Sequence, residues 1–280
     1  MQEIALAETY RKTRLPDTRL IAIEAMKRGV KAHYVCGFLE IDVTEARRRI
    51  KAAKSNGNHV SFTAWIVKCL ASAVKEFPEV NAYRKGRSAY VFETVNIGIM
   101  VERELGGEAV PLPYLVKDCG AKSVRDISRE IADVKTGYVG QDLVIADRQA
   151  ARIAKLAVWL PGPLRSLGLW IFFRNPERKQ KMMGTIGVTA VGMFGKSGGW
   201  PLPIPNLHPL AVAVGGISRR PLYTGEGDEL QPREMLDLTL MFDHDVIDGA
   251  PAARFSARLI ELMESAHGLE PQEGDSAVEL

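Results

Sequence analysis

The amino-acid sequence predicts an α/β fold in which helices pack on a mixed β-sheet. Helix-like and strand-like patterns are interspersed along the 280 residues without strict alternation, and two hairpins are expected. No Gly-x-Gly-x-x-Gly or phosphate-loop pattern follows a predicted strand, so a dinucleotide-binding fold is not indicated. The length fits one large domain or two small ones and allows a substantial core.

The composition is that of an ordinary globular protein, with 46% hydrophobic and 25% charged residues. The net charge of +3 is too small to indicate nucleic-acid binding. Cys36, Cys69 and Cys119 form no Cys-x-x-Cys pair, so neither a disulfide framework nor a zinc ribbon is expected. Residues 1–14 are charged and lack the apolar centre of a signal peptide. The expected location is a reducing cytoplasm.

The first eighty residues are predicted to form an arm, three helices and a strand. An arm over 1–16 ends at a proline, and 19–29 has helical apolar spacing and stops at a glycine. Residues 32–43 are rich in β-favouring side chains and predict a strand, which a charged helix over 44–55 follows. The clearest helix is 61–77, which has one broad apolar face, a serine cap and a terminating proline.

The middle of the sequence predicts a hairpin, a helix and a further strand. Apolar and polar residues alternate cleanly over 90–101, and 109–116 follows across a Gly-Gly turn. A Ser-x-x-Asp variant of the capping box begins a helix over 123–135. Residues 184–191 predict a strand, and the glycine-bearing stretch 192–199 predicts a loop.

The last seventy residues are predicted to form two strands, a helix and a tail. An apolar strand over 210–217 is joined through a hairpin loop at 222–232 to a strand over 235–242. The pattern over 250–263 predicts a helix. The polar stretch 268–280 is expected to be a flexible tail.

One apolar segment, 151–174, stands apart. Pro-Gly-Pro at 161–163 divides it into two short helical pieces, so a single straight membrane-spanning helix is not predicted. Two interpretations remain. The segment is either an apolar helical hairpin packed on a neighbouring subunit or over a pocket, or a peripheral membrane contact with Trp159 and Trp170 at the lipid interface.

The candidate chemistry lies in the turn 243–249, between the last strand and the last helix. A neutral imidazole at His244 can take a proton from a thiol or hydroxyl if one tautomer is held fixed. Three alternatives remain: a structural histidine, a helix cap at Asp248, or a metal cluster of Asp243, His244 and Asp245. The cluster is disfavoured because adjacent strand residues point to opposite faces.

The run His-Asp-Val-Ile-Asp-Gly at 244–249 resembles the catalytic signature of dihydrolipoamide acyltransferases, the core subunits of 2-oxo acid dehydrogenase complexes. Further blocks resemble the same family, namely the helix and its Pro-Glu-Val-Asn exit over 60–82, the strand 95–99, the glycine-rich strand and loop 184–195, and the strand 211–221. The similarity extends over 17–136 and 184–265.

The resemblance implies a chloramphenicol acetyltransferase-like two-layer sandwich over 17–267. An insert of about 137–183 replaces a shorter connection and carries the apolar helical segment. The resemblance also implies a homotrimer or a multiple of trimers. In this family the catalytic histidine and the oxyanion-stabilising hydroxyl come from adjacent subunits, and the two thiols enter a channel from opposite ends.

The resemblance implies a role for each candidate site residue. His244 would be the general base that deprotonates the thiol of coenzyme A or dihydrolipoamide, and Thr189 would donate to the oxyanion. Without the family, Thr189 is simply a β-favouring strand residue. The residues expected to orient the turn or line the channel are Asp248, Asp245, Gly249, His33 and Arg19, with Arg14 and Arg28 as alternatives to Arg19.

Three departures from the family pattern bear on this expectation. Asp245 stands where a basic residue is usual, and it would either raise the pKa of His244 or face solvent. Thr189-Ala190 stands where Ser-Asn is common. No lipoyl or peripheral-subunit-binding domain precedes the core, so the chain is expected to have no lipoyl group of its own.

The expected substrates are therefore an acyl thioester and a thiol, with coenzyme A as a substrate and no bound metal. A separate lipoyl or acyl carrier protein would deliver the acyl group. The alternative function is a catalytically inactive oligomeric scaffold, or a membrane-associated binding protein, with the same fold. Asp245 and Thr189-Ala190 are the best support for that alternative.

Overall fold

A computed structural model of the chain describes thirteen stretches, namely 12–13, 23, 26, 32–105, 108–136, 164, 167–168, 170–171, 174–190, 192, 198–205, 208–223 and 229–269. The strands are β1 (Tyr34–Asp42), β2 (Ala82–Lys85), β3 (Ser88–Val91), β4 (Ile97–Leu105), β5 (Glu108–Val116), β6 (Ile186–Ala190), β7 (Leu210–Tyr223) and β8 (Leu230–Asp243). The helices are α2 (Thr44–Ser55), α3 (Phe62–Glu76), the short 3-10 helix η1 (Pro78–Val80), α4 (Val124–Thr136), α7 (Pro176–Met183) and α8 (Gly249–Glu264).

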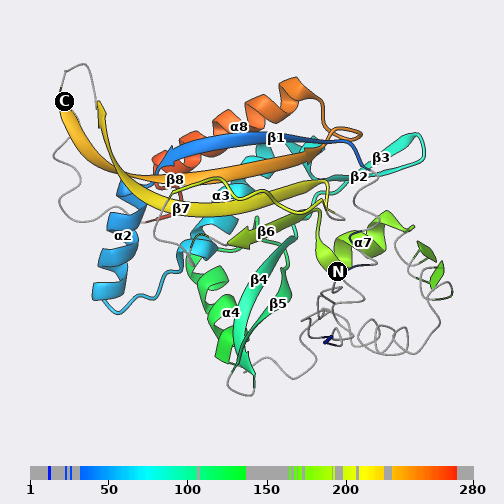
Figure 1. Ribbon diagram of the computed structural model, residues 1–280, viewed down its shortest axis with the longest axis horizontal. Helices are drawn as coiled ribbons and strands as arrows, with labels where there is room; N and C mark the ends of the chain where they lie inside the picture. The colour runs from blue at the N-terminus through cyan, green and yellow to red at the C-terminus, as the bar shows by residue number, and fades with distance from the viewer. Residues whose placement is uncertain are drawn as a thin grey trace, which may run out of the picture.

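Within the described residues, six strands form one mixed sheet in the order β1-β8-β7-β6-β4-β5 (Figure 1). The pairs β4–β6 and β6–β7 are parallel, and the other neighbours are antiparallel. Helices α3, α4 and α8 pack on one face of this sheet, while β2 and β3 form a separate hairpin. The prediction of a mixed-sheet α/β sandwich is confirmed.

The core lies between the sheet and these helices because the central strands alternate their side chains. Leu236, Leu238 and Leu240 of β8 face the helices and are completely buried. The residues between them, Asp237 and Thr239, are also buried but face the other side of the sheet. Strand β8 is thus covered on both faces, and it leads directly into the candidate catalytic turn.

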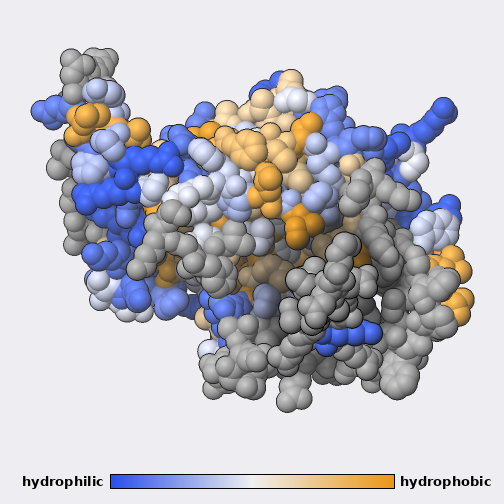
Figure 2. Space-filling view, viewed as in Figure 1, coloured by the Kyte–Doolittle hydropathy of each residue, from blue (hydrophilic) through white to orange (hydrophobic). Residues whose placement is uncertain are grey.

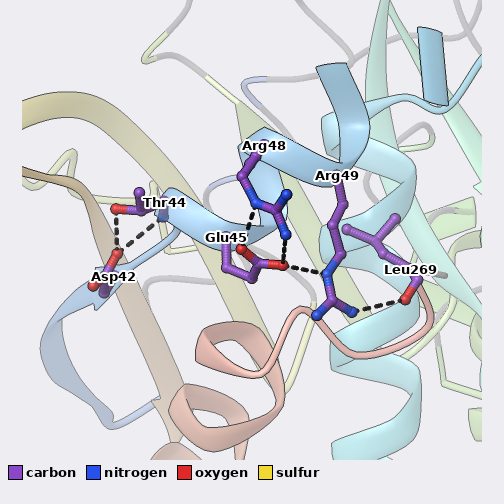
Figure 3. Close-up of polar contacts among 6 residues, drawn as sticks. All are labelled: Asp42, Thr44, Glu45, Arg48, Arg49 and Leu269. Atoms are coloured by element: carbon purple, nitrogen blue, oxygen red, sulfur yellow. Dashed lines mark hydrogen bonds and ion pairs between the residues drawn. The ribbon is translucent and has the colours of Figure 1, made fainter. Parts of the chain in front are cut away.

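Helix α2 is anchored at its first turn and near its middle by polar contacts (Figure 3). Asp42 Oδ1 accepts hydrogen bonds from the amide of Thr44 at 2.9 Å and from its hydroxyl at 2.6 Å. Glu45 pairs with Arg49, which also donates to the carbonyl oxygen of Leu269 at 3.2 Å. The chain is therefore held against α2 as far as Leu269, two residues into the predicted tail.

Most predicted boundaries agree with the structure to within a few residues, and the capping contacts of two helices are confirmed. The hydroxyl of Ser61 accepts from the amide of Ala64 at 3.5 Å, and Ser123 and Asp126 cap each other. The predicted 222–232 loop is shorter than expected, since β7 and β8 continue as a paired ribbon to Tyr223 and from Leu230.

The single strand predicted over 90–101 is wrong, because the chain is interrupted between β3 and β4. The buried side-chain amide of Asn81 donates to the carbonyl oxygens of Phe92 at 2.6 Å and Thr94 at 3.1 Å. These bonds hold the chain in a bend as it leaves the hairpin for the main sheet. The alternation in sequence spans the bend and does not reveal it.

Helix α7 was not predicted. Asn175 precedes it, and its side chain accepts from the amides of Glu177 at 2.9 Å and Arg178 at 3.3 Å. Pro176 occupies the first turn, and Gly184 ends the helix with a positive φ of 72°. The Asn-Pro start and the glycine stop are ordinary helix signals that a search restricted to apolar spacing misses.

Several predictions lie wholly or mostly outside the described residues: the arm 1–16, the helix 19–29, the loop 192–199, the apolar segment 151–174 and the end of the tail. Within these stretches, Ile23, Met26, Leu164, Leu167 and Trp170 are helical positions. The domain boundaries remain predictions.

Replacing Leu238 by Ala should lower the free energy of unfolding by about 2–5 kcal/mol, because it leaves a cavity in the completely buried centre of β8. The control is Leu230→Ala on the same strand, where the side chain is 55% exposed and the expected change is within about 0.5 kcal/mol. Urea denaturation measures both. Equal effects would contradict the placement of the core.

Candidate active site

The turn that carries His244 is held by backbone hydrogen bonds from two sides. The amide of Asp243 donates to the carbonyl oxygen of Pro209 at 2.7 Å, and the amide of His244 donates to that of His33 at 2.6 Å. The amides of Val246 and Ile247 then close the turn onto the carbonyl oxygen of Asp243. The side chain of Ile247 is buried, whereas His244 is exposed. The turn thus presents the imidazole on a rigid backbone.

The imidazole of His244 makes no hydrogen bond to any described residue. Asp248 occupies the N-cap position of α8, but its exposed carboxylate does not cap the helix. Gly249 begins α8, and a Cβ there would meet nothing within 4 Å. The proposed orienting arginine, Arg19, lies outside the described residues. Within one chain, the described residues therefore do not fix the imidazole tautomer.

Asp245 is bound by one histidine and one arginine side chain, and the histidine is not His244. Its Oδ1 lies 3.0 Å from Nδ1 of His33, and its Oδ2 accepts from Nη1 of Arg84 at 2.7 Å. The hydrogen bond with His33 and the charge of Arg84 lower the pKa of the Asp245 carboxyl. The acid that departs from the family pattern thus ties together the turn, the chain before β1 and the β2–β3 hairpin. Arg84 was missed because nothing in its local sequence identifies this long-range pair.

Thr189 lies on β6, far from His244 of the same chain. It pairs in register with Ala213 of β7, which pairs with Thr239 of β8. His244 is five residues beyond Thr239, so strand geometry separates Thr189 and His244 by roughly 15–20 Å. Thr189 is half-buried, and its side chain points away from the face of β6 that carries Ile186 and Val188 to the core. One chain does not bring the two candidate groups together.

A group of titratable side chains lies beside the turn, and the sequence did not single it out. Burial raises the pKa of Asp243, and burial together with Asp243 raises the pKa of Tyr34 to about 12. Burial lowers the pKa of Lys179 to about 8, against the opposing charge of Asp243. The Lys179 ammonium lies 3.8 Å from the ring centre of Tyr83, a cation–π contact. Helix α7 therefore contributes a half-buried lysine that interacts with Asp243, the residue before His244.

His208 is a further histidine close to this group, and its side chain is half-buried. Its Nε2 donates to the carbonyl oxygen of Met183 at 2.9 Å. The ring packs on the sheet where Gly187 leaves room, since a Cβ there would lie 2.8 Å from Nδ1 of His208. Burial lowers the pKa of His208 to about 4. His208 is therefore neutral at physiological pH.

Among the described residues, no three or more His, Cys, Asp or Glu side chains are arranged to hold a metal ion. Asp245 belonged to the metal cluster considered from the sequence, and its carboxylate binds His33 and Arg84. Within the same part of the chain, no helix has the length and apolar character needed to cross a bilayer.

Folding should become less favourable in acid because the unfolded chain protonates His208 at its ordinary pKa of about 6.5 and the folded chain only near 4. The stability due to this histidine is complete above pH 6.5 and is lost as the pH falls through 4. It should amount to about 3 kcal/mol. The unfolding free energy of the wild type minus that of His208→Gln should therefore fall as the pH is lowered from 7 to 4. A constant difference would contradict a half-buried, neutral His208.

Comparison with known proteins agrees with this fold. The family model for the 2-oxoacid dehydrogenases acyltransferase catalytic domain matches residues 7–153 and 176–270. The acetyltransferase component of the pyruvate dehydrogenase complex of Cupriavidus necator is 29% identical over 231 residues, covering 80% of this chain and 34% of that protein. The lipoamide acyltransferase component of the branched-chain complex of Bacillus subtilis is 27% identical, covering 81% of this chain and 46% of that protein. The chain thus spans about a third to a half of the length of these relatives.

Solved structures show the same fold. A probable dihydrolipoamide acetyltransferase from Listeria monocytogenes has a TM-score of 0.68 and 21% identity, over 98% of this chain and 100% of that one. The dihydrolipoamide acetyltransferase of Azotobacter vinelandii has a TM-score of 0.67 and 23% identity, over 94% and 96%. The mixed sheet, the turn at the end of β8 and the match over most of its length show that this chain belongs to the 2-oxoacid dehydrogenase acyltransferase family.

Proposed function

We propose that the chain transfers an acyl group between a thioester and a thiol, with His244 as general base and Thr189 as oxyanion donor. The observation that carries the proposal is the exposed imidazole, held by backbone bonds at the end of a buried strand, in a chain that matches an acyltransferase catalytic domain. Both residues lie inside the matched ranges.

The chemistry requires one base and one donor. A free thiol has a pKa of about 8.5, so little thiolate is present at neutral pH. His244 takes the thiol proton, and the thiolate attacks the acyl carbonyl to give a tetrahedral oxyanion. The hydroxyl of Thr189 donates to that oxyanion. When the intermediate collapses, the second sulfur leaves with the electron pair and takes the proton back from the imidazolium.

The separation of the two residues within one chain requires that the site form between subunits, and we propose a homotrimer or a multiple of trimers. Among the described strands, β1 pairs only with β8 and leaves its outer edge open. Val35 and Phe38 of β1 are 40% and 54% exposed, and Trp200 packs edge-on against Phe38. Figure 2 shows apolar surface gathered over β1. An open strand edge beside apolar surface is typical of a contact with another chain.

We propose coenzyme A as one thiol and a dihydrolipoyl or carrier-protein thiol as the other. Two relatives are named as the dihydrolipoyllysine-residue acetyltransferase component of a pyruvate dehydrogenase complex and the dihydrolipoyllysine-residue succinyltransferase component of a 2-oxoglutarate dehydrogenase complex. The second is from Staphylococcus aureus. These names support a lipoyl thioester as acyl donor. A peripheral membrane contact through 151–174 remains a separate proposal, supported by the exposed side chains of Leu164, Leu167, Trp170 and Ile171.

Replacing His244 by Ala should reduce acyl transfer from acetyl coenzyme A to dihydrolipoamide by about 10²–10⁴-fold, because the thiol loses its base. The exposed His59 offers a matched control, and His59→Ala should keep wild-type turnover. A spectrophotometric assay of the new thioester, with the oligomeric state checked by light scattering, makes the measurement. Undiminished turnover in the His244 variant would show that His244 is not the base, whereas a wild type without acyl transfer would support the inactive scaffold.

Replacing Thr189 by Val should lower kcat by about 10²–10³-fold, the usual effect of losing one oxyanion donor. Because valine has the same shape, the trimer should persist. The control is Thr94→Val, at an exposed threonine outside the sheet. An unchanged kcat would remove Thr189 from the mechanism.

Mixing the two inactive variants should restore activity if each site uses His244 of one subunit and Thr189 of the next. Random reassembly of equal amounts of His244→Ala and Thr189→Val chains gives about a quarter of sites with both groups intact. The expected activity after joint refolding is therefore up to about a quarter of wild type. A mixture as inactive as its components would place both groups of each site in one chain.

A further inference from the structure

A pocket of about 570 Å³ lies between the β2–β3 hairpin and the end of the apolar segment 151–174. Arg84, Lys85, Gly86 and Tyr90 form the hairpin wall, and Trp170 and Arg174 form the other wall. The family match stops at 153 and resumes at 176, so the second wall comes from a segment outside the family pattern. Figure 1 shows the hairpin and α7, which follows that segment, at the same end of the molecule.

The lining of this pocket is cationic and aromatic. Among the described residues that line it, three are basic, two are aromatic and none carries a carboxylate. The Lys85 ammonium lies 5.9 Å from the ring centre of Tyr90, and the Arg174 guanidinium lies 5.0 Å from that of Trp170. These contacts hold positive charge against an aromatic ring on each wall. Such a site attracts an anion and offers flat surfaces on which a ring can stack.

We propose that this pocket binds a nucleotide, with its phosphates on Arg84, Lys85 and Arg174 and its base stacked on Trp170 or Tyr90. Guanidinium groups bind phosphate oxygens through two parallel hydrogen bonds, and stacking of a base on an aromatic ring is favourable for every base. An acidic peptide side chain would use the cations but not the two rings. The phosphates and purine of coenzyme A and a free adenine nucleotide share the required chemistry.

The position of Arg84 connects this pocket to the candidate catalytic turn. The same guanidinium that lines the pocket donates to Oδ2 of Asp245, the residue after His244. A phosphate bound to Arg84 would therefore be separated from Asp245 of the turn only by the Arg84 side chain. This location suits the remote end of a substrate whose thiol reaches His244, since binding at a remote group can position the reacting one. The inference that the bound nucleotide is part of coenzyme A rests on the proposed function. The inference that the pocket binds a nucleotide does not.

The direct test is a calorimetric titration of the intact assembled protein with ADP, with coenzyme A and with inorganic phosphate. The double variant Lys85→Ala/Arg174→Ala should weaken ADP binding by about tenfold or more, because it removes two charge-assisted contacts. Arg178→Ala is the matched control, an exposed arginine of α7 that does not line the pocket, and it should bind as wild type does. Binding by wild type should weaken as salt is raised. Equal affinity for ADP in the double variant and wild type, or no binding by wild type, overturns the proposal.

A kinetic comparison identifies the source of the nucleotide. If it is coenzyme A, the double variant should raise the KM for coenzyme A about tenfold and leave kcat unchanged, while the KM for pantetheine, which has no nucleotide, should not change. If ADP binding depends on the pocket but the KM for coenzyme A does not, the site holds a free nucleotide. Nucleotide binding without any acyl transfer would support the pocket and overturn the proposed function.

Discussion

The pairing of β8 with its two neighbours determines both the core and the candidate site. Its register against β1 and β7 directs Leu236, Leu238 and Leu240 into the helical layer. The same register ends with backbone bonds from Asp243 and His244 to Pro209 and His33, which fix where the imidazole stands. A shift of one residue would turn the leucines away from the helices and direct Asp237 and Thr239 into the core. The stability of the fold and the position of the base therefore depend on one register.

Polar side-chain contacts rather than apolar packing hold the solvent-facing side of the turn that carries His244. Asp245 joins His33 and Arg84, and all three side chains are accessible to water, so each pair contributes little to the stability of the fold. The contribution of Asp245 is geometric, since it connects the turn to the hairpin whose basic residues line the pocket. On the buried side of the turn, Lys179 of α7 and Asp243 interact through their charges, while burial lowers the pKa of Lys179 and raises that of Asp243.

The sequence was sufficient for the fold class, most element boundaries and the family. Periodic apolar patterns identify α3 and β8 because burial on one face imposes their spacing. The break between β3 and β4 was missed because it depends on Asn81, ten residues or more from the carbonyl groups that it binds. Arg84 was missed for the same reason, since its partner Asp245 is 161 residues away. Local propensity carries no information about such pairs. The expectation that two subunits share each active site came from the family resemblance alone. Thr189 and His244 lie too far apart within one chain to act on the same substrate, which gives that expectation a physical basis.

The central claim is that two chains complete each active site, and a structure of the assembled protein with coenzyme A bound tests it most directly. The distances of interest run from the coenzyme A sulfur to the imidazole of His244 and to the hydroxyl of Thr189 in a neighbouring copy. The account predicts that both groups face one channel, with a reacting atom about 3 Å from each. A structure in which His244 faces open solvent, with no Thr189 from another copy across a channel, would contradict it.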